Sequence, residues 1–285
     1  MVNNHNQLLS AYYSKRTNDV HKYYTNELYK ALQFINIQDT NQISLDTGYQ
    51  LISYFRSTST KSNDTINKII SFFKSVLKKN HIHCSFDELP RLRIKTNHYQ
   101  RFYHDDLKTI VDYLIHLKAN KNSICYKTAV FLMIDSGCRV GELVSIKKKN
   151  IDFESTPMRI YLEETKNRKS RYVPFSEFSK PYILELMKRH DQPSLFWNFK
   201  FDTPFTRSCL RSFYRVMQDK LNLDRVYSHR FRKSFASILA ENGMSLYDLQ
   251  LLLDHTRIST TQLYVQSKQD RGLKSYTTYN DWGIN

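Results

Sequence analysis

Glycine and proline are scarce in this chain of 285 residues, which contains six of each. So few glycines leave little material for a glycine-rich phosphate-binding loop, and no such motif is present. All prolines lie at or beyond Pro90, and no glycine lies between Gly48 and Gly137. The N-terminal third therefore contains few helix breakers, which favours uninterrupted helices there.

Cysteine and long apolar runs are also limited. The four cysteines are widely spaced, as expected of reduced thiols rather than of a disulfide framework. No stretch of about 18 apolar residues is present. The N-terminal segment also lacks the apolar centre of a secretion signal. The sequence therefore predicts a cytoplasmic protein without a membrane span.

Motifs for metals and cofactors are missing as well. The segment "HIHC" at 81–84 is not followed by a second Cys/His pair at zinc-ligand spacing. No Ser–His or Cys–His motif emerges either. We therefore expect neither a metal nor a cofactor.

Positive charge, in contrast, is abundant. The chain has 43 Lys and Arg against 27 Asp and Glu, a formal net charge of +16. A basic solubilising surface is the ordinary explanation. An excess of this size favours a polyanionic partner such as nucleic acid, held through phosphate contacts. Charge alone does not decide whether chemistry follows binding.

Helical spacing of apolar residues dominates the N-terminal part. It is clearest in three segments, 19–35, 47–57 and 63–80. Residues 1–85 are predicted to form a small bundle of about four helices. Residues 86–103 break the period and are predicted to be a linker, and residues 104–285 are predicted to form a second domain with a C-terminal tail.

The second domain contains one segment with strand periodicity, "MRIYLEETKNRKSRYVPFS" at 158–176. Ile160 and Leu162 alternate with exposed positions, and Val173 and Phe175 do the same after a polar, basic turn. This pattern predicts a β-hairpin among further helices. The expected fold class is therefore mainly α with a small β-hairpin or sheet.

The segment "YSHRFRKSFASILAENG" at 227–243 predicts a helix with Ser228 as N-cap and Gly243 just beyond its C-terminus. His229 and Arg232 are three residues apart and share one face of the first turn. That end of a helix favours an anion. Taken alone, a capping histidine and a surface arginine are the more ordinary interpretation.

Two short helices are predicted further on. Ser245 caps the first, which ends before His255, and Ser259 with Gln262 forms a capping box for the second. Tyr264 then lies in the second turn of that second helix. A tyrosine there would ordinarily pack.

Two more basic residues, Arg139 and Lys166, lie between predicted secondary-structure elements. Arg139 follows a helix that ends in "SG" and is three residues from Glu142, with which it could pair on the surface. Lys166 lies at the hairpin tip, where a lysine is usually exposed to solvent. Each of these features is weak by itself.

Their order and spacing together resemble the active-site series of the tyrosine recombinases, the phage-integrase family. The matching boxes are "SGCRVGEL", "TKNRKSRYVPF", "SHRFRKSFAS" and "LLDHTRISTTQLY", within residues 100–268. The N-terminal helices are similar only in type to the family's core-binding domain. The resemblance implies a helical core-binding domain, which clamps DNA, followed by an α+β catalytic domain.

One departure from the family pattern concerns Asp254, where the family usually has glycine. Asp tolerates a left-handed backbone better than most residues, so we expect the turn to be kept. A carboxylate beside His255 is also expected to favour the charged form of that histidine.

The resemblance implies that Tyr264 attacks a DNA phosphodiester and forms a 3′-phosphotyrosyl intermediate, without metal or ATP. Arg139 and Arg232 would neutralise the phosphate, because guanidinium groups bind two oxygens at once. Glu142 would orient Arg139.

Three further roles follow from the resemblance. His229 would act as general base toward Tyr264, Lys166 would protonate the leaving 5′-oxygen, and His255 would hydrogen-bond the phosphate. A free tyrosine has a pKa of about 10 and needs such help at neutral pH.

The function implied is that of a site-specific DNA recombinase acting on double-stranded DNA with specific core sites, as a homotetramer on two sites. Two alternatives stay open at this point. One is a type IB topoisomerase-like nicking-closing enzyme, and the other is a DNA-binding regulator with a decayed active site.

Overall fold

The computed structural model describes residues 19–58, 61–94, 101–118, 120–163 and 170–256, together with Ile258 and Thr261. The predicted positions of Lys166 and Tyr264, the capping box at Ser259 and the C-terminal tail lie outside the described residues. The chain divides into two compact units, residues 1–96 and 97–285. Each unit is described by itself.

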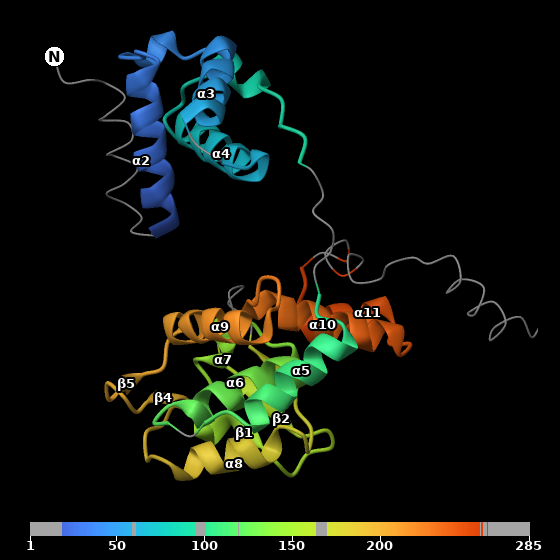
Figure 1. Ribbon diagram of the computed structural model, residues 1–285. Coiled ribbons are helices and arrows are strands. Elements are labelled where there is room, and N and C mark those ends of the chain that lie inside the picture. The colour runs from blue at the N-terminus through green and yellow to red at the C-terminus, as the bar shows by residue number, and fades with distance from the viewer. Residues whose placement is uncertain are drawn as a thin grey trace, which may run out of the picture. The chain divides into compact units, whose positions relative to one another are not determined.

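The first unit contains three described α-helices, which confirm the three helices expected from the apolar spacing. They are α2 (Asp19–Phe34), α3 (Leu45–Thr58) and α4 (Asn63–Lys79), with short 3-10 turns η1 (Thr40–Gln42) and η2 (Ser85–Glu88) (Figure 1). Their apolar faces meet in one core that includes Leu28, Leu51, Phe55 and Phe73. Ser62 caps α4, since its hydroxyl accepts a hydrogen bond from Thr65 N.

The first unit extends further along the chain than the predicted linker boundary at 86. Phe86 and Leu89 are buried in its core. The Asn67 side chain also accepts from Leu92 N and donates to Leu92 O, both at 2.9 Å. A few buried side chains and the Asn67 hydrogen bonds therefore hold the first residues of the predicted linker against the first unit.

The second unit is mostly helical, and α6 lies between α10 on one side and α8 on the other (Figure 1). Almost every side of α6 is buried, which explains its nearly continuous apolar sequence. The helices of this unit are α5 (His104–Ile115), α6 (Ser123–Ser136), α7 (Val140–Leu143), α8 (Lys180–Lys188), α9 (Arg207–Leu221), α10 (Ser228–Glu241) and α11 (Leu246–Leu253), with the 3-10 turn η3 (Lys148–Asn150).

The predicted hairpin is confirmed as part of a three-stranded antiparallel sheet. Its strands are β1 (Ile151–Asp152), β2 (Arg159–Leu162) and β3 (Arg171–Pro174), in the order β1-β2-β3. Ile160 pairs with Val173, and both are fully buried, as the alternation predicts. The two-residue strands β1, β4 (Trp197–Asn198) and β5 (Thr203–Pro204) were not expected. A strand of two residues is too short to show the alternation of buried and exposed side chains that identifies strands in a sequence. The fold is mainly α with small sheets.

The start of α10 differs from the prediction. Ser228 is the first residue of this helix rather than its N-cap, and its hydroxyl lies 3.0 Å from the Tyr214 hydroxyl. That tertiary contact competes with local capping of the helix. Helix α6 ends at Gly137, whose φ is +60°, and Gly243 follows α10 with φ +97°.

No helix within the described ranges combines the length and apolarity that a bilayer crossing requires.

Replacing Gly137 by Ala should destabilise the protein more than the same change at Gly243. Both positions have positive φ, which disfavours alanine, but only at Gly137 would the added Cβ lie 2.2 Å from the Phe235 ring. We expect a loss of about 3 kcal/mol of unfolding free energy for Gly137→Ala and about 1 kcal/mol for Gly243→Ala. Urea denaturation measures both, and equal losses would contradict the close contact.

Candidate active site

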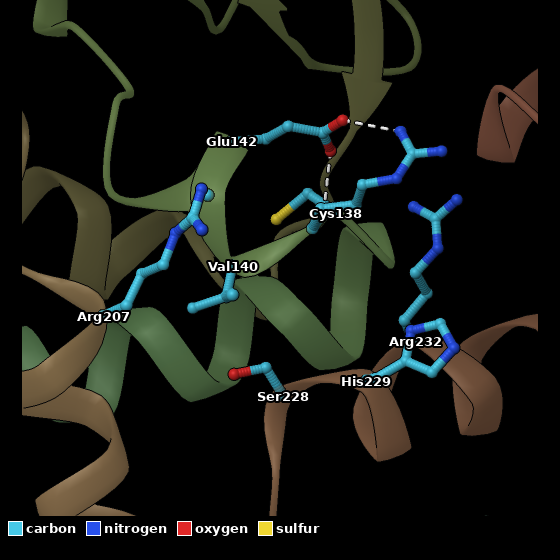
Figure 2. A pocket seen from close by; sticks show the side chains of 9 residues that line it. Cys138, Val140, Glu142, Arg207, Ser228, His229 and Arg232 are labelled. Carbon is cyan, nitrogen blue, oxygen red and sulfur yellow. Dashed lines mark hydrogen bonds and ion pairs between the residues drawn. The ribbon is translucent and has the colours of Figure 1, made fainter. Parts of the chain in front are cut away.

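A pocket of about 490 Å³ opens where the α6–α7 junction meets the first turns of α9 and α10. Figure 2 shows His229 and Arg232 rising from one helix, with Arg207 across the pocket from them. The residues that line it are Cys138, Arg139, Val140, Gly141, Glu142, Arg207, Ser228, His229 and Arg232. Cationic and imidazole side chains therefore gather around one small volume.

Arg232 is buried rather than on the surface, with 1% of its area exposed. Its guanidinium donates to Gly137 O at 2.8 Å and to Leu253 O, and its Nη2 lies 3.1 Å from His255 Nε2. A buried guanidinium needs such partners, because an unpaired charge in the interior is costly. The contacts hold Arg232 in place at the wall of the pocket.

Arg139 is anchored by a carboxylate on each side. Its Nη1 lies 2.8 Å from Glu142 Oε1 and 3.5 Å from Asp254 Oδ2, and its Nη2 donates to Asp254 O at 2.9 Å. Glu142 also accepts from the Arg139 backbone N–H at 2.7 Å. This arrangement is what the predicted orienting role of Glu142 requires.

Glu142 binds a second guanidinium that the sequence analysis did not single out. Arg171 Nη2 lies 2.8 Å from Glu142 Oε2, and both side chains are largely buried. Burial alone would raise the pKa of Glu142, but Arg171 and then Arg139 lower it below its usual value. Glu142 is therefore an anion that links β3, the base of the hairpin, to α7.

The C-terminal end of α11 supplies the remaining partners. The backbone carbonyls of residues 252–254 accept hydrogen bonds from Arg171, Arg232 and Arg139 in turn. The last carbonyls of a helix have no intrahelical partner and carry the negative end of its dipole. Asp254 ends the helix with φ +52°, which confirms the expected left-handed turn.

Both site histidines are neutral in this environment. Burial, followed by the charges of Arg232, Lys233 and Arg139, lowers the pKa of His229 to about 4. Burial and then Arg232 likewise lower the pKa of His255 to about 4. The expectation that Asp254 favours a charged His255 is wrong, because its carboxylate faces Arg139 while a guanidinium faces His255 Nε2.

Arg207 adds a further cation from the start of α9. A Cβ on Gly141 would lie 2.1 Å from the Arg207 Nη2, so the glycine leaves room for that guanidinium beside α7. The described residues of the site and its wall include four arginines, Arg139, Arg171, Arg207 and Arg232, but only two carboxylates, Glu142 and Asp254. With neutral histidines, a net positive charge is left, which suits a phosphate.

Comparisons with known proteins agree with this chemistry. A sequence model described as the phage integrase family matches residues 100–271, more than half of the chain. The chain belongs to the phage integrase family. It is similar to a probable integrase/recombinase of Acholeplasma phage L2, with 41% identity over 99% of this chain and 97% of that protein. It is also similar to the tyrosine recombinase XerC of Staphylococcus epidermidis, with 29% identity over 62% of this chain and 60% of that protein.

Solved structures of tyrosine recombinases share the fold. The Tn1549 transposon integrase in complex with a circular intermediate DNA matches with a TM-score of 0.77 and 17% identity, over 95% of this chain and 98% of that chain. A lambda integrase dimer bound to a core site matches with a TM-score of 0.70 and 15% identity, over 91% and 94%. At these identities the likeness concerns the fold, and it confirms the predicted fold class. The activity follows from the family membership: the chain is a DNA strand-exchange enzyme of the tyrosine recombinase type.

The structure brings most of the predicted site residues together. Arg139, Glu142, His229 and Arg232 line one pocket, and His255 contacts Arg232. Lys166 and Tyr264 lie outside the described residues, so their placement stays a prediction.

Arg171 and Arg207 were missed by the sequence analysis. Arg171 lies in the quoted box "TKNRKSRYVPF", where it looked like one more basic residue of a hairpin. Arg207 shares α9 with Arg211 and Arg215 at intervals of four, a spacing that is typical of a solvated helix face. No local signal distinguishes either residue from a surface charge.

Arg171→Gln should destabilise the second unit strongly. It removes one partner of the buried Glu142 carboxylate, and we expect a loss of about 3 kcal/mol of unfolding free energy. Arg159→Gln is the matched control on the neighbouring strand, since its ion pair with Asp152 is exposed to solvent. Chemical denaturation should show almost no change for the control; equal losses for both variants would contradict a structural role for the Arg171–Glu142 pair.

The two site histidines should titrate well below the ordinary histidine pKa of about 6.5. Because their folded-state pKa values are lowered, protonation of these histidines favours the unfolded state. The free energy of unfolding should therefore keep its full value above about pH 6.5 and decrease as the pH falls toward 4. NMR titration of the free protein measures both rings. Arg139→Gln should raise both pKa values, because it removes a nearby positive charge; titration of either wild-type ring near pH 6.5 would count against this electrostatic account.

Proposed function

We propose that this recombinase cleaves and rejoins DNA strands at specific sites, with Tyr264 as nucleophile and the arginine-lined pocket as the site of the scissile phosphate. The observation that supports this most directly is the convergence of Arg139, Arg232 and His229 on one pocket, with His255 bonded to Arg232. Three separate segments of the chain supply these residues: the α6–α7 junction, the first turn of α10 and the end of α11.

The reaction forms and breaks one phosphoester bond at each step. The phenol oxygen of Tyr264 attacks the phosphorus, a 3′-phosphotyrosyl bond forms, and the DNA 5′-hydroxyl leaves. The 5′-hydroxyl of another strand then attacks the same phosphorus and releases the tyrosine. Because the covalent intermediate conserves the bond energy, rejoining needs no ATP.

Arg139 and Arg232 stabilise the negative charge that develops on the phosphate oxygens. Their guanidinium groups are already held at the pocket wall by Glu142 and by the carbonyls of α11, so little reorganisation accompanies binding. Loss of one such donor typically costs about 3 kcal/mol in the transition state. This electrostatic contribution is the largest that the site offers.

His229 acts as the general base toward Tyr264 and returns the proton on rejoining. Its lowered pKa keeps the ring neutral at physiological pH, as a proton acceptor must be. Lys166 protonates the leaving 5′-oxygen, and His255 donates a hydrogen bond to the phosphate. The roles of Lys166 and Tyr264 rest on the sequence match alone.

The substrate we propose is double-stranded DNA with specific core sites. The net charge of +16 fits a phosphate backbone. Related proteins are described with DNA, including XerH bound to its difH substrate and lambda integrase as a dimer on a core site. We extend this to a homotetramer on two sites, acting in the cytoplasm. The relatives from a phage and a transposon favour a mobile element as the context.

The two alternatives are not favoured. The relatives named above are an integrase/recombinase and a Xer recombinase, which favours strand exchange over a topoisomerase-like activity. A decayed active site would not be expected to keep both of the proposed phosphate-binding arginines and both histidines. Yet Arg139, His229 and Arg232 line one pocket, and His255 lies within hydrogen-bond distance of Arg232.

A nicked-duplex library with a randomised central sequence tests the proposal and finds the site. Cleavage a few nucleotides from the nick, in the nicked strand, releases a short fragment that carries the leaving 5′-hydroxyl, so rejoining is prevented, the covalent protein–DNA adduct is trapped and its DNA can be sequenced. Wild type should form the adduct, and Tyr264→Phe should bind DNA but form none. Tyr247→Phe is the matched control, because this exposed tyrosine lies on the nearby helix α11.

An adduct that persists in Tyr264→Phe would disprove the assignment of the nucleophile. Arg139→Ala should slow adduct formation by roughly a hundredfold. Rapid relaxation of supercoiled DNA that lacks the recovered sequence would favour the topoisomerase-like alternative.

A further inference from the structure

Thr261 contacts the site although neither the sequence pattern nor the proposed mechanism assigns it a role. Its side chain is fully buried, and its Oγ1 lies 3.0 Å from His255 Nδ1. The opposite ring nitrogen, Nε2, lies 3.1 Å from Arg232 Nη2. The His255 backbone is fixed as well, because its N–H donates to Gln250 O and its carbonyl accepts from Gln250 Nε2. The imidazole is thus held from both sides.

These contacts define the tautomer of the ring in the absence of DNA. A guanidinium has only donors, so the His255 Nε2 must accept the hydrogen bond from Arg232. The proton of the neutral ring therefore lies on Nδ1, which donates to the Thr261 hydroxyl. The lowered pKa of His255 agrees with a neutral ring.

Hydrogen bonding to a phosphate requires the other tautomer. A phosphate oxygen only accepts, so His255 has to present a proton on Nε2, the nitrogen that faces Arg232 and not Thr261. Nδ1 then becomes an acceptor. Among side chains of this size, a hydroxyl is suited to both situations, because it can accept from Nδ1–H or donate to bare Nδ1.

We propose that Thr261 is a positioning residue whose hydroxyl holds the His255 ring in one orientation while the ring changes from an acceptor for Arg232 to a donor for the scissile phosphate. This inference rests on the proposed function of the pocket. The proton balance is neutral: Nδ1 releases one proton to solvent water and Nε2 takes one up. Thr261 thereby also ties the segment that precedes Tyr264 in the sequence to the phosphate site.

The tautomer change can be observed directly in the protein with 15N-labelled histidine. The probe is inorganic phosphate, added until the signals of His229 reach a plateau. We expect His255 protonated on Nδ1 in the free protein and on Nε2 with phosphate. A ring that stays protonated on Nδ1, or that becomes doubly protonated at the plateau, would overturn the switch whether or not the protein cleaves DNA.

Cleavage kinetics on the trapped duplex test the role of Thr261 itself. Thr261→Val removes the hydroxyl at nearly constant size and should slow adduct formation by about tenfold at unchanged DNA affinity. Thr261→Ser keeps the hydroxyl and should restore the rate to within about twofold. In a His255→Ala background, Thr261→Val should cause no further loss.

The double variant separates positioning from packing. If Thr261→Val slows cleavage equally with and without the His255 imidazole, its effect comes from packing, and the inference is wrong. Absence of any adduct in wild type would instead refute the proposed function, while the NMR result would still decide the tautomer change.

Discussion

The end of helix α11 is the feature on which the site depends. Three guanidinium groups converge there, and such like charges repel one another strongly where water is scarce. The carbonyls of residues 252–254 take one hydrogen bond from each guanidinium, and the buried Glu142 carboxylate binds both Arg139 and Arg171. A helix C-terminus and one anion thus stabilise a cationic pocket before any substrate is present.

This arrangement requires a residue at position 254 that tolerates a left-handed backbone. The helix has to stop there with a left-handed residue, so that its last carbonyls point toward the arginines rather than continue the helix. Asp254 adopts this conformation and adds a carboxylate 3.5 Å from Arg139. Compared with glycine, it gives Arg139 a second anionic partner, and it also reduces the positive charge that a phosphate meets.

Local patterns predicted the elements well, but the contacts between distant elements were not predictable. The alternation at Ile160 and Val173 identified the hairpin, and Ser245 marked the start of α11, because both signals depend on neighbours in sequence. Arg171 reaches α11 across 81 residues, and nothing local distinguishes it from a solvated arginine. The burial of Arg232 has the same cause: spacing gives the face of a helix, but not what covers it.

The arginines that we propose to bind the phosphate also lower the pKa values of the two histidines, and in the proposed mechanism this links binding to catalysis. Without a phosphate, Arg232 and Arg139 both lower the pKa of His229 and His255. A bound phosphate offsets these positive charges, so the histidine pKa values rise toward the ordinary value. In the mechanism we propose, His229 then takes a proton from Tyr264 more readily. The proposed base thus becomes stronger only when the phosphate to be attacked is in place, which would limit activation of the nucleophile to the DNA-bound state.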